Sequence, residues 1–139
     1  MPPKEDDRPS IPDDRRLVRV AIRESWIQVD KNTGQLRPTS DSLLESNFEA
    51  SCFIQGEVPI EEIQRLFPQK RLYIVTAGVL REAGFFIERR PDEAPDGLSR
   101  PEAHVVVGPP TEIARNNYTR SCRAVVKNPA IEIIDVEQA

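Results

Sequence analysis

The sequence is poor in the residues and motifs from which most enzyme sites are built. Its 139 residues include one histidine and two cysteines, which excludes paired histidine ligands. Neither Cys52 nor Cys122 has a cysteine or histidine near it at metal-ligand spacing. The chain contains no Walker-type glycine loop, no glycine-rich dinucleotide turn and no Gly-x-Ser-x-Gly elbow. These absences argue against the commonest enzyme classes, and we expect neither a metal nor a cofactor.

Long apolar runs are also absent. No stretch approaches the ~18 residues of a membrane span, and the N-terminus lacks the apolar region of a secretory signal. We therefore expect a cytoplasmic protein without membrane contact, in which cysteines stay reduced. Because Cys52 and Cys122 both fall within apolar patterns, we interpret them as small core residues.

Proline and acidic charge are concentrated at the N-terminus. Residues 1–14 hold four prolines, five acids and two bases, so they carry −3 of the net charge of −4. A segment of this composition buries too little apolar surface to offset the entropy of ordering it. We therefore predict a disordered acidic tail over residues 1–14. The remaining body is nearly neutral, which argues against a general grip on nucleic acid but leaves room for a local basic patch.

Hydrophobic periodicity predicts a single α+β domain over residues 15–139. Strands are expected at 17–22, 26–29, 49–54, 72–76, 85–87, 104–108 and 131–134, and helices at about 59–67, 77–83 and 112–127. Because these elements interleave without βαβ regularity, we expect a mixed or mostly antiparallel sheet with about three helices on one face. The longest helix lies near the C-terminus, where Thr111 is placed to cap it. Residues 90–102, with three prolines and a glycine, predict a mobile loop.

The single histidine is the first candidate for chemistry. His104 opens an apolar strand directly after a charged loop, where a buried sheet meets solvent. Such a position suits a general acid or base, because small shifts move the pKa of histidine across physiological pH. The alternative is a histidine at a strand start that bonds the preceding loop, and the lack of a spaced partner favours this alternative.

The second candidate is a polar segment between residues 26 and 40. It contains Trp26, Asp30, Arg37, Thr39 and Ser40 on a turn-rich connection. The guanidinium of an arginine can hold a phosphate or carboxylate, and nearby hydroxyls at a helix N-terminus would complete an anion site. In the alternative, the tryptophan fills the core, the aspartate closes a turn, a hydroxyl caps a short helix, and the arginine lies on the surface.

The third candidate is a basic flank on the longest predicted helix. The apolar positions of this helix form one stripe, at Ala114, Tyr118, Cys122 and Val125. The basic flank lies away from the stripe and consists of Arg115, Arg120, Arg123 and Lys127. Four cations on one side could bind an acidic partner or a phosphate backbone. A merely solvated face is the alternative, and it is favoured because few aromatics remain to stack on bases.

Three groups of these residues resemble a set of small uncharacterised bacterial proteins. The groups are Trp26…Asp30…Arg37-Pro38-Thr39-Ser40, Thr76-Ala77-Gly78…Arg81 and His104-Val105-Val106-Val107-Gly108. The resemblance covers about residues 17–126 and implies a bacterial source. It transfers no activity, but it draws attention to Arg37, Ser40 and His104 as a possible set.

Three functions remain, in this order. The first is a non-catalytic interaction protein or accessory subunit of a larger bacterial assembly, whose partner is another protein. The second is a small transferase or hydrolase for a phosphate-bearing substrate, in which Arg37 binds the anion, His104 is the acid or base, and Ser40 or Asp30 assists. It requires these residues to converge on one pocket. The third is nucleic-acid binding through the basic flank. The balance leans away from an enzyme.

Overall fold

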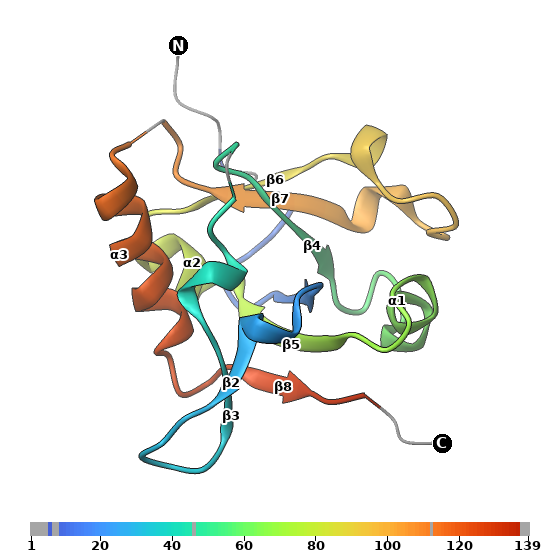
Figure 1. Cartoon of the computed structure of the whole chain (residues 1–139). Coiled ribbons are helices and arrows are strands. Elements are labelled where there is room, and N and C mark those ends of the chain that lie inside the picture. The colour runs from blue at the N-terminus through green and yellow to red at the C-terminus, as the bar shows by residue number, and fades with distance from the viewer. Residues whose placement is uncertain (1–5, 7–8, 46, 112, 137–139) are drawn as a thin grey trace.

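The centre of the molecule is a six-stranded antiparallel sheet. The structure, a computed structural model, describes residues 6, 9–45, 47–111 and 113–136. The sheet strands are β1 (Arg16–Ala21), β4 (Ala50–Ile54), β5 (Arg71–Thr76), β6 (Phe86–Arg89), β7 (His104–Gly108) and β8 (Glu132–Ile134), in the order β6-β7-β4-β1-β5-β8. A separate hairpin pairs β2 (Ile27–Val29) with β3 (Leu36–Pro38). The helices are α1 (Ile60–Leu66), α2 (Ala77–Glu82) and α3 (Arg115–Val126) (Figure 1). The predicted α+β class is confirmed, with an antiparallel sheet and the longest helix near the C-terminus.

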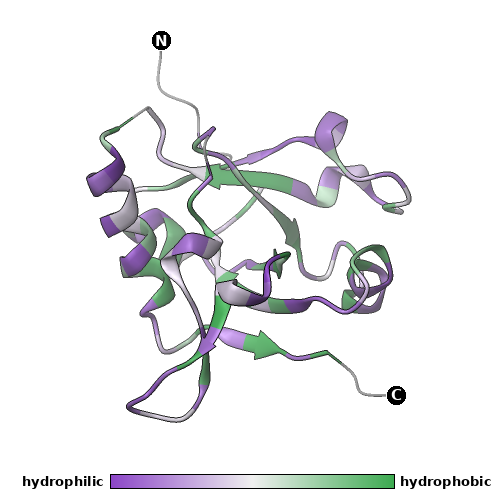
Figure 2. Cartoon of the chain, viewed as in Figure 1, coloured by the Kyte–Doolittle hydropathy of each residue, from purple (hydrophilic) through white to green (hydrophobic). Residues whose placement is uncertain are grey.

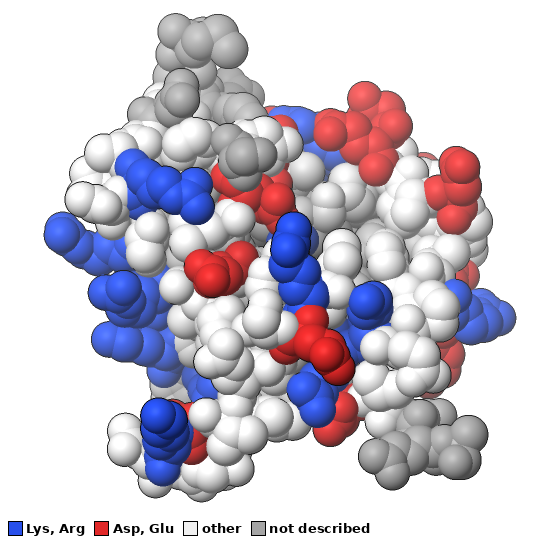
Figure 3. Space-filling view, viewed as in Figure 1, with Lys and Arg blue, Asp and Glu red and all other residues white. Residues whose placement is uncertain are grey.

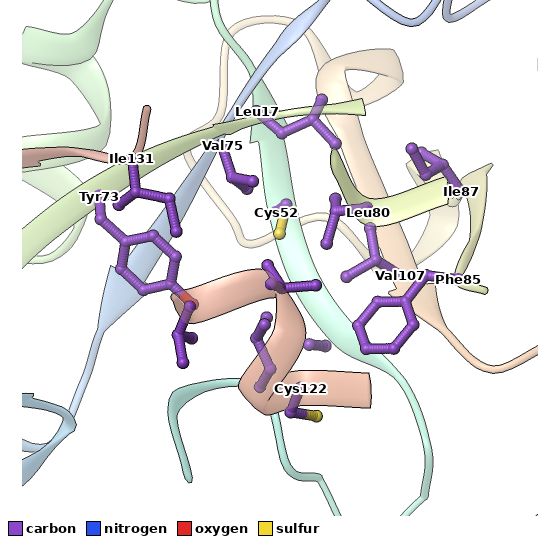
Figure 4. Close-up of a cluster of buried hydrophobic side chains, with 14 of the residues drawn as sticks. Leu17, Cys52, Tyr73, Val75, Leu80, Phe85, Ile87, Val107, Cys122 and Ile131 are labelled. Carbon is purple, nitrogen blue, oxygen red and sulfur yellow. The ribbon is translucent and has the colours of Figure 1, made fainter. Parts of the chain in front are cut away.

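The sheet is covered on both faces, whereas we expected helices on one face only. Alternation along β1 places Leu17 in a core cluster with α2, α3 and the hairpin, and places Val18 in a second cluster with α1. Figure 4 shows the first cluster, in which Cys52 and Cys122 both lie. Both cysteines are fully buried, as predicted. The second layer follows from consecutive apolar residues in the central strands, because such strands are apolar on both faces. Figure 2 shows these apolar strands at the centre and polar residues along the outer side of α3.

Helix α3 begins three residues later than its expected start at residue 112. Its N-cap is Ala114, which makes no side-chain hydrogen bond, so Thr111 does not cap it. Ile113, just before the helix, packs against the first core cluster instead of entering the first turn. Three residues of the predicted apolar stripe, Tyr118, Cys122 and Val125, are buried, whereas Ala114 is exposed at the N-cap, so its place in the stripe is wrong.

The described part of the N-terminal segment, residues 6 and 9–14, is packed against the body, although we expected a disordered tail there. Ile11 is fully buried in the first core cluster. The carboxylates of Asp6 and Asp13 accept hydrogen bonds from Arg81 at 2.7–3.0 Å. The amide of Gly78 donates to the Asp13 carbonyl at 2.8 Å. Two contacts therefore hold this segment on the body: the burial of Ile11 and the ion pairs of Arg81, whose side chain is 5% exposed. Composition alone predicted that the segment would be unstructured. Residues 1–5, 7 and 8 lie outside the described residues.

The burial of Ile11 gives a direct test of this packing. We expect Ile11→Ala to lower the free energy of unfolding by about 2–3 kcal/mol, the usual effect of removing a buried isoleucine side chain. Ile22 is the matched control, because its side chain is 48% exposed, and Ile22→Ala should change stability by less than about 0.5 kcal/mol. Urea denaturation of both variants measures the difference. Equal effects would show that residue 11 lies outside the core.

The segment 90–102, expected to be a mobile loop, packs against the second core cluster. It contains two short 3-10 helices, Pro91–Glu93 and Pro101–Ala103. Between them Leu98 is buried, and Ser99 donates from its amide and its hydroxyl to the carboxylate of Glu62 on α1, at 3.0 and 2.9 Å. These two hydrogen bonds hold the pKa of Glu62 below its ordinary value. The segment is thus anchored near its middle to α1.

Candidate functional site

One hollow that the predicted site residues line is a groove between the β2–β3 hairpin and the C-terminal half of α3. It has a volume of about 440 Å³. Six lining residues carry charged or hydroxyl groups, namely Asp30, Arg37, Thr39, Ser40, Arg123 and Lys127. We call it the hairpin groove. It unites four residues of the second sequence candidate, Asp30, Arg37, Thr39 and Ser40, with two cations of the basic flank, Arg123 and Lys127.

Arg37 is positioned by the end of α3. Pairing of Gln28 with Arg37 in the hairpin sets its place on β3. Its Nη2 donates to the carbonyl oxygens of Val126 at 2.8 Å and Asn128 at 2.6 Å. The last carbonyls of a helix lack partners within the helix and carry partial negative charge, so a guanidinium stabilises them. Arg37 is therefore a structural ligand of the helix end as well as a groove residue.

The hydroxyl residues of the groove begin the short 3-10 helix Ser40–Ser42, which packs against α3. Thr39 precedes this helix without a side-chain capping bond, and its Oγ1 donates to the Trp26 carbonyl at 3.3 Å. The predicted short helix near residue 40 is thus confirmed, but a hydroxyl cap on it is wrong. Thr39 instead joins the hairpin to the buried Trp26.

Asp30 closes the hairpin turn. Its Oδ1 accepts from the amide of Asn32 at 2.8 Å, and its carbonyl accepts from Gly34 at 2.7 Å. Gly34 has a φ of +73°, a conformation that glycine adopts without strain. The carboxylate is already used in the turn, so Asp30 serves the role of the alternative interpretation and supplies one negative charge at the groove.

His104 does not share this groove. It is 2% exposed, its Nδ1 lies 2.7 Å from the carbonyl oxygen of Arg90, and its ring packs edge-on against Phe53. Phe53 belongs to the second core cluster, whereas the hairpin that carries Arg37 packs on the first. The sheet therefore separates His104 from Arg37, Ser40 and Asp30. The proposed catalytic set does not converge, and His104 bonds the preceding loop as the alternative interpretation states.

The basic flank is a group of cations without carboxylate partners among the described residues. Arg115, Arg120, Arg123 and Lys127 are exposed, and none forms an ion pair with any residue that the structure describes. By contrast, seven other arginines form such pairs, namely Arg15, Arg16, Arg19, Arg71, Arg81, Arg89 and Arg90. In Figure 3, blue side chains are stacked along the side of the molecule that α3 occupies in Figure 1. Positive charge on this side is thus uncompensated within the described chain.

The buried nucleophiles are held in their unreactive forms. Burial raises the pKa of the Cys52 thiol to about 11 and that of Cys122 to about 12. A thiolate is the reactive species, so neither cysteine is activated at neutral pH. Burial also raises the pKa of Tyr118 to about 12.

Within the described ranges, no three His, Cys, Asp or Glu side chains are grouped closely enough to hold a metal ion. No helix there has the length and apolar character of a membrane span.

Comparison with known proteins returns no match to a family model, to a curated protein or to a solved structure. The resemblance to small bacterial proteins therefore stays a prediction. Sequence reasoning missed that Arg37 and the basic flank meet in one groove. The three residues of β3, Leu36–Pro38, are too few to show the alternation that predicts a strand. The hairpin that carries Arg37 to the end of α3 was therefore not predicted.

Proposed function

We propose that this chain is a non-catalytic interaction protein, an accessory subunit of a larger bacterial assembly, and that its basic flank docks on an acidic surface of another protein. One observation carries the proposal. The four cations of the flank lack carboxylate partners among the described residues, while seven arginines elsewhere have them. Charge complementarity of this kind selects partners and speeds their encounter.

The composition of α3 supports this interpretation. Residues 115–127 contain three arginines and one lysine but no aspartate or glutamate. Like charges along one helix repel one another. An aspartate or glutamate four residues away from a cation would offset this repulsion, but α3 contains neither. A partner that supplies acids would relieve it in the complex. The remaining exposed positions, Asn116, Asn117 and Ala124, are polar or small and suit the rim of a protein interface.

Catalysis is less well supported because the candidate residues are dispersed. His104 and Arg37 lie against different core clusters, and both thiols are buried.

Nucleic-acid binding is less well supported for two reasons. The exposed face of α3 carries no aromatic side chain for stacking on bases. Acidic side chains also gather over the 90–102 segment (Figure 3), so the positive field does not extend over that part of the surface.

Site-specific photo-cross-linking in cells that naturally express the chain tests the proposal. Ala124 is exposed on α3, and a photoreactive amino acid at this position should give a discrete protein adduct that resists nuclease. The quadruple variant R115Q/R120Q/R123Q/K127Q should reduce the yield of this adduct at least tenfold, since rim charges govern association. Higher salt should reduce it as well, because exposed charges are screened.

A matched control removes the same number of charges elsewhere. Five other exposed cations form no ion pair with described residues, namely Arg23, Lys31, Arg65, Lys70 and Arg100, and the control uses the four that lie outside the β2–β3 hairpin. The variant R23Q/R65Q/K70Q/R100Q has the same net charge as the flank variant and should keep the adduct yield within about twofold. A nucleic-acid adduct, no adduct, or equal losses in both variants would each contradict the proposal.

A further inference from the structure

The hairpin groove contains a guanidinium whose orientation is fixed by the protein. Both hydrogens of Arg37 Nη2 are taken up by two backbone carbonyls, those of Val126 and Asn128. A guanidinium grips a carboxylate with two parallel N–H groups, and Nη2 belongs to both of the edges that present such a pair. With Nη2 occupied, neither edge is free for a two-point grip. The Nε and Nη1 hydrogens remain, and they make no hydrogen bond within the described chain.

Two further cations and a hydroxyl complete the groove. Arg123 and Lys127 line it and have no carboxylate partner among the described residues. The hydroxyl of Ser40 lines it as well and makes no hydrogen bond to any other described residue. Asp30 is the one acid in the lining, so the charge of the described lining is +3 − 1, or +2. The groove thus offers several separate donors around a net positive centre.

We propose that the hairpin groove binds a phosphate monoester carried by a side chain of the docked partner. This inference rests on the proposed function, since the groove adjoins the basic flank. A phosphate monoester has three terminal oxygens and nearly two negative charges at neutral pH. It can take one hydrogen bond from each of Arg37, Arg123 and Lys127. A carboxylate has two oxygens and is held best by the two-point grip that Arg37 no longer offers.

Titration with inorganic phosphate at pH 7.5, followed by amide chemical shifts of the whole chain, tests the site itself. We expect saturable shifts at Thr39, Ser40 and Lys127, and acetate should bind at least tenfold more weakly. The variant R123Q/K127Q should weaken phosphate binding at least tenfold and keep the dispersed spectrum of a folded protein. Both side chains are exposed and unpaired among described residues, so the fold does not depend on them.

A second hollow provides the matched control. Arg65 and Lys70 line a depression of about 510 Å³ beside α1, so R65Q/K70Q removes one arginine and one lysine from a hollow of similar size, as R123Q/K127Q does. The variant R65Q/K70Q should leave the affinity for phosphate unchanged within about twofold. Phosphate shifts that do not saturate, that are equal in the two double variants, or that acetate reproduces at the same concentration would overturn the site.

Peptides identify the source of the phosphate. A short acidic peptide with one central phosphoserine should bind more tightly than inorganic phosphate, because its flanking acids reach the basic flank. The same peptide with serine or glutamate at the centre should bind at least tenfold more weakly than the phosphopeptide. If a free nucleoside monophosphate binds more tightly than the phosphopeptide, the phosphate does not come from a side chain of the partner.

If phosphate fails to bind while the Ala124 adduct still depends on the flank, only this inference fails. If phosphate binds and no protein adduct forms, the proposed function fails.

Discussion

Arg19→Ala is expected to lower the free energy of unfolding by about 3 kcal/mol, because it removes a buried guanidinium that donates to two carbonyls and to Glu45, whose side chain is 35% exposed. The side chain of Arg19 is 4% exposed. Its Nε donates to the Ser42 carbonyl at 2.9 Å, its Nη1 to the Ser51 carbonyl at 2.9 Å, and its Nη2 to the carboxylate of Glu45 at 2.8 Å. Alanine would leave two carbonyls and a carboxylate without these donors and would open a cavity in the first core layer.

The loss should extend to the site, because Arg19 supports the elements that carry the hairpin groove. Its guanidinium lies 5.1 Å from the ring centre of Trp26, a geometry in which a cation is attracted to the aromatic face. The carbonyl of Ser42 that it binds belongs to the 3-10 helix that starts at Ser40. We therefore expect Arg19→Ala to broaden or shift the amide signals of the groove as well as to reduce stability.

Arg16 is the matched control for this prediction. It lies on the same strand and forms an ion pair with Glu132, but its side chain is 45% exposed. Exposed pairs contribute little, so Arg16→Ala should lower the free energy of unfolding by less than about 1 kcal/mol. Guanidinium chloride denaturation of both variants gives the comparison. Similar losses for the two arginines would show that Arg19 is not a buried anchor.

Local periodicity predicted nearly every strand and helix of this fold, because alternation and helical spacing are properties of neighbouring residues. Contacts between distant residues could not be predicted in this way. Ile11 stands alone among prolines and acids, so nothing nearby indicates that it reaches the core. Arg19 interrupts an apolar strand, and only the folded chain shows that Glu45 and two carbonyls surround it. The second layer over the sheet likewise depends on where α1 folds back.

The candidate site was predicted in part, for the same reason. The sequence placed Arg37, Thr39 and Ser40 together as a possible anion site at a helix N-terminus. Arg37 instead binds the C-terminal end of α3, 89 residues from it in the sequence at Val126. The basic flank was predicted from helical spacing alone, but its approach to the hairpin was not. His104 matched a general base in sequence position, yet the sheet directs it to the opposite core.

Gly108→Ala is expected to lower the free energy of unfolding by about 4 kcal/mol, more than ordinary overpacking does, because the obstacle is a backbone atom. A Cβ at position 108 would lie 1.9 Å from the carbonyl oxygen of Phe48. A side chain could rotate away, but this carbonyl can move only with its chain segment. Gly108 has no positive φ, so the whole effect comes from the close approach at the end of β7.

The displacement should be transmitted to α3, which links this glycine to the proposed docking surface. The ring of Phe48 stacks on Tyr118 at 5.0 Å, and the Tyr118 hydroxyl donates to the Leu43 carbonyl at 2.7 Å. Moving Phe48 therefore disturbs the contact that seats α3 on the segment before β4. Gly34→Ala is the control, since no atom lies within 4 Å of the added Cβ and the backbone has a φ of +73°. Backbone strain alone should then lower stability by about 1 kcal/mol. Thermal and urea denaturation of both variants measure the difference. Equal stabilities would contradict the close contact between Gly108 and the Phe48 carbonyl, and they would also contradict its role in positioning α3.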